Sequence, residues 1–232
     1  TKKTNRAFNE ISRLHTLYLS GTPFKQLAEG RFSSSQIYNW TYADEQQAKD
    51  TWDTENTNPY ERLPKLAMFT YQISPMITGM LKQGIDFSED EHGEYAFDLN
   101  EFFITNESGK FVHEEDVKKF LHALSTQDKY PFSTPNLRKE LAHTMWYMNR
   151  VASAKALKKL LNEDPVFSEY NVVVAAGNVK ENNRELETDN QKQDKAYELV
   201  KDAIENYDKT ITITVGQLTV GVTIPEWSGV LM

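Results

Sequence analysis

Apolar positions in the N-terminal third of the chain occur in short runs that are separated by polar, turn-forming stretches. The runs at residues 15–19 and 66–73 are too short for buried helices, and each predicts a buried strand. Pro64 and Pro75 flank the second run. Between the two runs, residues 42–52 have the pattern of a helix. A further helix, with Thr4 as its N-cap and apolar positions from Ala7 to Leu14, is expected before the first run, so this part of the chain is expected to contain two strands and two helices.

Residues 76–135 differ from their surroundings because glycines separate short acidic pieces. One helix is predicted here, beginning near Glu114, since three acidic residues in its first turn suit the positive end of a helix dipole. We interpret the whole stretch as a helical or mixed insert. The apolar stripe of the expected helix consists of Val117, Phe120, Leu121 and Leu124.

The chain alternates between strand and helix patterns from about residue 136 onward. One expected helix is capped at Asn149, and a capping box at residues 188–191 opens the other. The order of elements predicts an α/β fold in which right-handed crossovers connect the strands of a parallel sheet. The expected strands are residues 144–148, residues 172–176, residues 210–215 and a fourth at the C-terminal end.

Loops at the carboxyl ends of parallel strands are the usual functional positions in such sheets. Here these ends are residues 149–150, 177–178 and 215–217. The last of them opens a loop, residues 215–226, which contains two glycines, several hydroxyl groups and an amide side chain. Its backbone N–H groups suit the phosphate of a nucleic acid strand or of a nucleotide.

Charge and composition narrow the possible functions. The chain has 232 residues with 26 Lys and Arg against 34 Asp and Glu, a net charge of −8, so it does not bind nucleic acid through overall positive charge. We expect DNA contacts at a few strand-end loops, and acidic residues on the insert and the outer helices. Because cysteine is absent, disulfides, thiolate zinc sites and cysteine nucleophiles are excluded.

The chain has no pattern of a membrane span or of a basic leader, so we expect a cytoplasmic protein without membrane partners. It begins at Thr1 and ends in an apolar run, which suggests a piece of a longer protein. The sequence contains no phosphate-binding loop of the GxxxxGK[ST] type, no GxSxG motif and no HExxH motif. The sequence motifs therefore predict neither a catalytic group nor a metal site.

Three stretches, in this order, resemble motifs III, IV and V of superfamily two helicase motors, in particular the DEAD/DEAH-like motors of restriction enzymes. The stretch similar to motif IV is residues 143–154, and the one similar to motif V is residues 215–225. The stretch that looks like motif III consists of Ser20, Gly21, Thr22 and Pro23.

The resemblance implies a RecA-like parallel sheet with flanking helices, which forms the second helicase lobe, together with the insert and the tail of the first lobe. Residues 1–24 would end the first lobe, and residues 25–75 would connect it to the second and supply its entering strand. Residues 76–135 would be an inserted subdomain, and residues 136–232 a truncated second lobe.

The same resemblance implies roles for single residues. Those of motif III would couple the two lobes. Gly221 and Thr223 would face the nucleotide cleft. Motifs I, II and VI are missing from the chain, so ATP and Mg²⁺ are expected to bind only to the full-length parent, and the isolated fragment is expected to be inactive. The residues that would contact DNA are Asn149, Arg150, Gly216, Gln217 and Thr219.

The expected function is that of a fragment of an ATP-dependent DNA helicase or translocase, a hydrolase within a restriction-modification enzyme. Its expected partners are DNA, the rest of the motor, and nuclease or methylase domains. One alternative is a non-catalytic α/β interaction module whose acidic insert recruits a protein partner. Another is a small-molecule α/β enzyme that binds a phosphate at residues 216–221 and uses Glu226 as the base.

Overall fold

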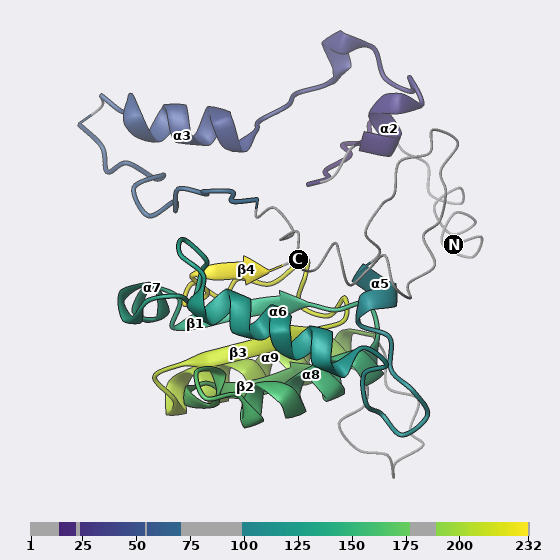
Figure 1. The fold of residues 1–232 in the computed structure, drawn as a ribbon. Coiled ribbons are helices and arrows are strands. Elements are labelled where there is room, and N and C mark those ends of the chain that lie inside the picture. The colour runs from purple at the N-terminus through teal and green to yellow at the C-terminus, as the bar shows by residue number, and fades with distance from the viewer. Residues whose placement is uncertain (1–13, 22–23, 54, 71–98, 177–188, 232) are drawn as a thin grey trace, which may run out of the picture. The chain divides into compact units, whose positions relative to one another are not determined.

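The computed structural model describes residues 14–21, 24–53, 55–70, 99–176 and 189–231. The chain divides into two compact units, Thr1–Phe69 and Thr70–Met232, and each is described by itself. The second unit contains the sheet (Figure 1) and the strand ends at residues 149–150 and 215–217, whereas the third expected strand end, residues 177–178, lies outside the described residues.

The sheet has four strands, in the order β2-β3-β1-β4, and every neighbouring pair is parallel (Figure 1). The predicted α/β fold with a parallel sheet is confirmed, and this architecture is consistent with a RecA-like fold. The three longer strands begin and end within one residue of their expected positions. The strands are β1 (His143–Tyr147), β2 (Asn171–Ala175), β3 (Thr210–Thr214) and β4 (Gly229–Leu231).

Helices cover both faces of the sheet. Two of them, α6 and α8, share one apolar core with the sheet, and α9 packs on the opposite face. The long helices are α6 (Glu114–Thr126), α8 (Val151–Glu163) and α9 (Asp189–Asn206). The short ones are α5 (Leu99–Phe102), α7 (Pro135–Glu140) and the 3₁₀ turn η2 (Phe167–Glu169).

The two faces follow from the alternation of side chains along each strand. In β2, Val172 packs with α8, whereas Val173, the next residue, packs with α9. Burial on both faces explains why β2 is apolar at nearly every position. In β3 the α9 face instead holds fully buried threonines at residues 210, 212 and 214.

The described part of the expected insert, residues 99–135, packs into the core that α8 and the sheet share. Helix α6 begins at Glu114 as predicted, and three members of its predicted stripe are buried while Phe120 is partly buried. On the same side of the sheet, Phe132 packs against Trp146 of β1 with ring centroids 5.7 Å apart. The proposed division of the chain into lobes and an insert stays a prediction.

The first unit contains α2 (Phe24–Ala28), the 3₁₀ turn η1 (Ser34–Gln36) and α3 (Tyr42–Asp50). The helix predicted at residues 42–52 is thereby confirmed. It begins at a capping box in which the Asp44 carboxylate accepts from the Thr41 backbone N–H at 2.8 Å, and Thr41 Oγ1 accepts from the Asp44 N–H at 3.3 Å. Polar side chains also tie the helix to the returning chain, since Lys49 donates to the Leu63 carbonyl at 2.7 Å.

The two strands predicted for this unit are not formed where the structure describes them. Residues 15–19 and 66–70 belong to no helix or strand, and all of them are exposed. Their apolar composition predicted burial, but a strand also needs a hydrogen-bonding neighbour, and the described residues of the unit provide none. The remaining expected strand residues, 71–73, lie outside the described part of the chain, as do residues 4–13 of the helix expected before the first strand.

Candidate functional site

Strands β1 and β3 end next to each other at the carboxyl edge of the sheet. Tyr147 is in register with Thr214, and the Met148 N–H extends the ladder by donating to the Thr214 carbonyl at 2.8 Å. Since the two strands run in the same direction, Asn149 and Gly216 follow at this shared edge. These two strand ends therefore lie next to each other.

After β1, the chain turns directly into α8. Arg150 is the N-cap residue, with an extended backbone (φ −136°, ψ 140°) and no side-chain capping bond. The prediction that Asn149 caps this helix was wrong by one residue. The Asn149 amide instead donates to the side-chain carbonyl of Asn100 in α5. Both Asn149 and Arg150 are exposed, and Arg150 forms no ion pair with another described residue.

After β3, the loop of residues 215–223 has three left-handed positions. Gly216 has φ +84° and Gly221 has φ +76°, a conformation that glycine adopts without strain. Leu218 adopts φ +61° and is only 3% exposed, because its side chain packs into the core beneath α9. The buried Leu218 side chain anchors the loop, while Thr219 and its neighbours stay exposed.

Hydrogen bonds within the loop fix its course. The Thr214 hydroxyl group donates to the Gln217 carbonyl and also lies 3.3 Å from the Ala175 carbonyl of β2. The Thr219 hydroxyl group donates to the Gly216 carbonyl at 2.9 Å. The half-buried Gln217 side chain has no hydrogen bond to another described residue, so its amide is available to a ligand.

Two side chains of α9 contact the segment that follows β3. Gln193 Nε2 donates to the Val220 carbonyl at 3.1 Å, and Lys201 Nζ lies 2.8 Å from a carboxylate oxygen of Glu226. The hydrogen bond from Lys201 lowers the pKa of Glu226 below its usual value. The loop is therefore attached to α9 at two points.

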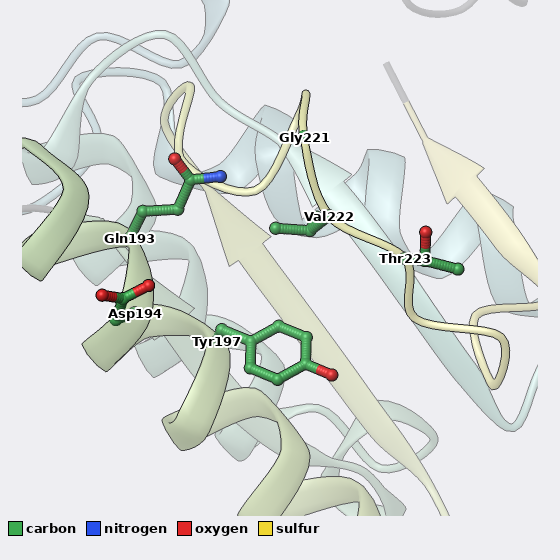
Figure 2. A pocket seen from close by; sticks show the side chains of 6 residues that line it. All are labelled: Gln193, Asp194, Tyr197, Gly221, Val222 and Thr223. Atoms are coloured by element: carbon green, nitrogen blue, oxygen red, sulfur yellow. The ribbon is translucent and has the colours of Figure 1, made fainter.

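A pocket of about 600 Å³ lies between α9 and this loop (Figure 2). Gln193, Asp194 and Tyr197 line it from the helix. Gly221 and Thr223 are among the loop residues that line it, although Figure 2 shows the Val222 side chain directed toward α9 and that of Thr223 directed away. The groups that line the pocket from α9 are the Gln193 amide, the Asp194 carboxylate and the Tyr197 phenol ring.

The site residues implied by the resemblance fall into three groups. Five lie at the carboxyl edge on the segments that follow β1 and β3, and two line the pocket beside α9. Ser20 and Gly21 belong to the first unit, whereas Thr22 and Pro23 lie outside the described residues. The carboxyl-edge group consists of Asn149, Arg150, Gly216, Gln217 and Thr219.

Sequence reasoning missed the α9 side of the pocket. Gln193 and Tyr197 are four residues apart and so share one face of the helix, and this spacing was the only available signal. Within the described residues, no group of three His, Asp or Glu side chains could hold a metal ion, and no helix there is long and apolar enough to cross a membrane.

Comparison with known proteins found a relative in Mycoplasma pneumoniae. The relative's provisional name is type II restriction enzyme and methyltransferase, C-terminus; it is 28% identical over 242 aligned positions. The alignment covers 95% of this chain but 32% of the relative, so the chain spans about a third of that protein's length. No family model matches the chain, and no solved structure matches it. The similarity supports a relation to restriction-modification enzymes.

Proposed function

We propose that this chain is part of an ATP-dependent DNA translocase within a restriction-modification enzyme, and that it supplies contacts to the DNA strand. The observation that carries the proposal is the meeting of two strand ends at one edge of a parallel sheet, where exposed Arg150 lies near the loop that begins at Gly216. The similarity to a protein named as a restriction enzyme and methyltransferase supports the restriction-modification part of the proposal.

Each group at this edge fits a positioning role. The guanidinium group of Arg150 suits a phosphate oxygen, and the side-chain amides of Asn149 and Gln217 suit phosphate or sugar oxygens. Thr219 stands on the exposed part of the loop, and the left-handed backbone at Gly216 lets a strand approach the main chain closely. These groups make and break no bonds themselves.

The chemistry of ATP hydrolysis is assigned to other parts of the full-length protein. The chain has no phosphate-binding loop, and its described residues include no group of acidic side chains suited to Mg²⁺. In the proposed enzyme, Gly221 and Thr223 face the nucleotide cleft, and Ser20 to Pro23 couple the two lobes. The remaining motor segments and the nuclease or methylase domains are the proposed partners of this chain.

The test uses the full-length protein with the change Arg150→Ala. We expect the stimulation of ATP hydrolysis by DNA to fall by at least about tenfold, since a charge-assisted phosphate contact is lost, while the affinity for ATP stays unchanged. DNA-stimulated ATPase activity and equilibrium ATP binding are measured in parallel. If DNA stimulation survived unchanged, the assignment of this strand end to DNA contact would be wrong.

A non-catalytic interaction module remains the second candidate, and one observation favours it. The first unit has four aromatic rings in a connected row, of which three are exposed and that of Tyr60 is half-buried. Tyr38 stacks on Trp40, Trp40 contacts Tyr60, and Tyr60 contacts Trp52, with centroids 6.1–6.4 Å apart. Exposed aromatic groups of this kind are enriched in protein interfaces. Under this candidate, Arg150→Ala has no effect on DNA-dependent activity.

A further inference from the structure

Helix α8 has an unusual charge distribution for a protein of net charge −8. From its N-cap at residue 150 through its last residue at 163, the segment contains four basic residues and one acidic residue, Glu163, at its C-terminal end. The expectation that acidic residues occupy the outer helices is therefore wrong for this helix. Its basic residues are Arg150, Lys155, Lys158 and Lys159.

The three lysines lie on one solvent-facing side of α8. Lys155 and Lys159 are exposed, and Lys158 between them is half-buried. The opposite side, which includes Leu157 and Leu161, is fully buried against the sheet. Since four residues rise about 6 Å along a helix, Lys155 and Lys159 stand one turn apart on the same face.

On neighbouring α6, on the same side of the sheet, the lysines instead pair with acidic residues of their own helix. Its Lys118 lies 3.0 Å from Glu114 and 2.9 Å from Glu115, and its Lys119 lies 3.2 Å from Asp116. No lysine of α8 forms an ion pair with a described residue. Lys159 acts on Glu114 only at longer range, as a minor cause of the lowered pKa of that carboxyl group, after Lys118.

Helix stability does not account for the placement of the charges either. Cations favour the C-terminal end of a helix and oppose the positive N-terminal end. Arg150 nevertheless occupies the N-cap of α8, and the first turn of α8 has no acidic residue, whereas that of α6 has three. The lysines of α8 therefore form no ion pair with a described residue, and the helix that carries them begins at the carboxyl edge of the sheet, where Asn149 and Arg150 lie.

We infer that the exposed face of α8, formed by Lys155, Lys158 and Lys159, binds the phosphate backbone of DNA and extends the contact surface from the strand ends along the helix. The inference rests on the proposed function, and it deepens it by adding a sequence-independent backbone contact. Lysines suit this role because each ammonium group neutralises one phosphate and releases its counterion. DNA is the partner whose charge complements this face.

The experiment measures binding of the 232-residue chain to a fluorescent duplex oligonucleotide across a salt series. The variant is Lys155→Gln with Lys159→Gln. The matched control is Lys118→Gln with Lys119→Gln, which removes the same charge from α6. Glutamine is a good helix former, so both double variants keep their helices. A third variant, Gln217→Ala, probes the strand-end loop separately.

We expect the α8 variant to bind about tenfold more weakly at low salt and to lose about 0.9 from the salt slope for each phosphate contact removed. The α6 variant is expected to bind as the unaltered chain does. Equal losses in the two double variants, or unchanged binding by the α8 variant, would overturn the inference.

The outcomes also separate the inference from the proposed function. Binding that depends on Gln217 but not on the α8 lysines leaves the proposed strand-end contacts standing and refutes the helix contact. Binding that depends on the α8 lysines alone supports the helix contact and counts against the strand-end assignment. A chain that binds no duplex even at low salt refutes both.

Discussion

The threonines of β3 differ in how their buried hydroxyl groups are satisfied. The Thr214 hydroxyl group lies against two carbonyl groups, whereas that of Thr212 has no partner among the described residues although its side chain is fully buried. An unsatisfied buried hydroxyl group costs free energy, since water hydrogen-bonds it in the unfolded chain. Two residues of the same type in one strand therefore contribute oppositely to stability.

This difference predicts the effect of replacing each threonine by valine, which has nearly the same shape. Thr212→Val is expected to raise the free energy of unfolding by about 1 kcal/mol, and Thr214→Val to lower it by about 1–2 kcal/mol. Urea denaturation of both variants measures the two values. Equal destabilisation by the two changes would show that Thr212 has a hydrogen-bond partner after all.

The sequence alone could not distinguish these threonines. The residue pattern at 210–215 predicted the strand, because a strand depends on a local pattern. The partner of Thr214 is a carbonyl of the following loop, whose left-handed turns bring Gln217 back to the strand. Such a contact depends on three-dimensional loop geometry that no sequence period encodes.

Among the elements, the loop between β3 and β4 and helix α9 are attached through the Lys201–Glu226 ion pair. Each residue was visible in the sequence, but their pairing across 25 positions was not. The pair requires α9 and the loop between β3 and β4 to lie side by side on one face of the sheet. Strand and helix patterns thus predicted which elements form. They could not predict that α9 lines one side of the pocket, because this depends on how the elements pack together.

The ion pair predicts how stability depends on pH. The pKa of Glu226 is lowered from 4.5, chiefly by its hydrogen bond with Lys201, so its contribution is fully present above about pH 4.5 and is lost as the pH falls through the lowered value. The variant Glu226→Gln is expected to lose less stability than the unaltered chain between pH 5 and pH 3. Thermal unfolding at several pH values measures this.

Glu198→Gln is the control for that experiment, since Glu198 is an exposed carboxyl group on α9 without an ion pair to a described residue. Its acid sensitivity is expected to equal that of the unaltered chain. If both variants behaved alike, the Lys201–Glu226 pair would contribute nothing to the pH dependence.

At the scale of the whole molecule, the two units differ in how they are held together. The second unit has apolar cores on both faces of its sheet, whereas no residue described in the first unit is buried. Hydrogen bonds around α3, such as that from Lys49 to the Leu63 carbonyl, give the first unit its local order. Apolar composition correctly predicted the core of one unit but not the exposure of the other, because burial requires a partner surface as well as apolar side chains.

Limited proteolysis is expected to reveal this difference. Chymotrypsin, which cleaves after aromatic residues, should cut at exposed Tyr38 and Trp40 well before the buried Phe132 and Trp146. Mass spectrometry of the early fragments identifies the sites, and digestion in urea shows whether the four sites are equally susceptible once unfolded. First cleavage at Phe132 or Trp146 in native buffer would contradict the expected order.

The order of the strands also determines when the sheet can form during synthesis. Among the described strands, the two neighbours of β1 both come later in the chain, with His143 paired to Thr210 and Thr144 paired to Gly229, and β2 pairs with β3. Within this described sheet, neither β1 nor β2 has a strand to bind until β3 has left the ribosome. Their apolar side chains are therefore exposed for the time needed to translate the intervening residues, and this delay is the period in which a nascent chain of this fold is most dependent on chaperones.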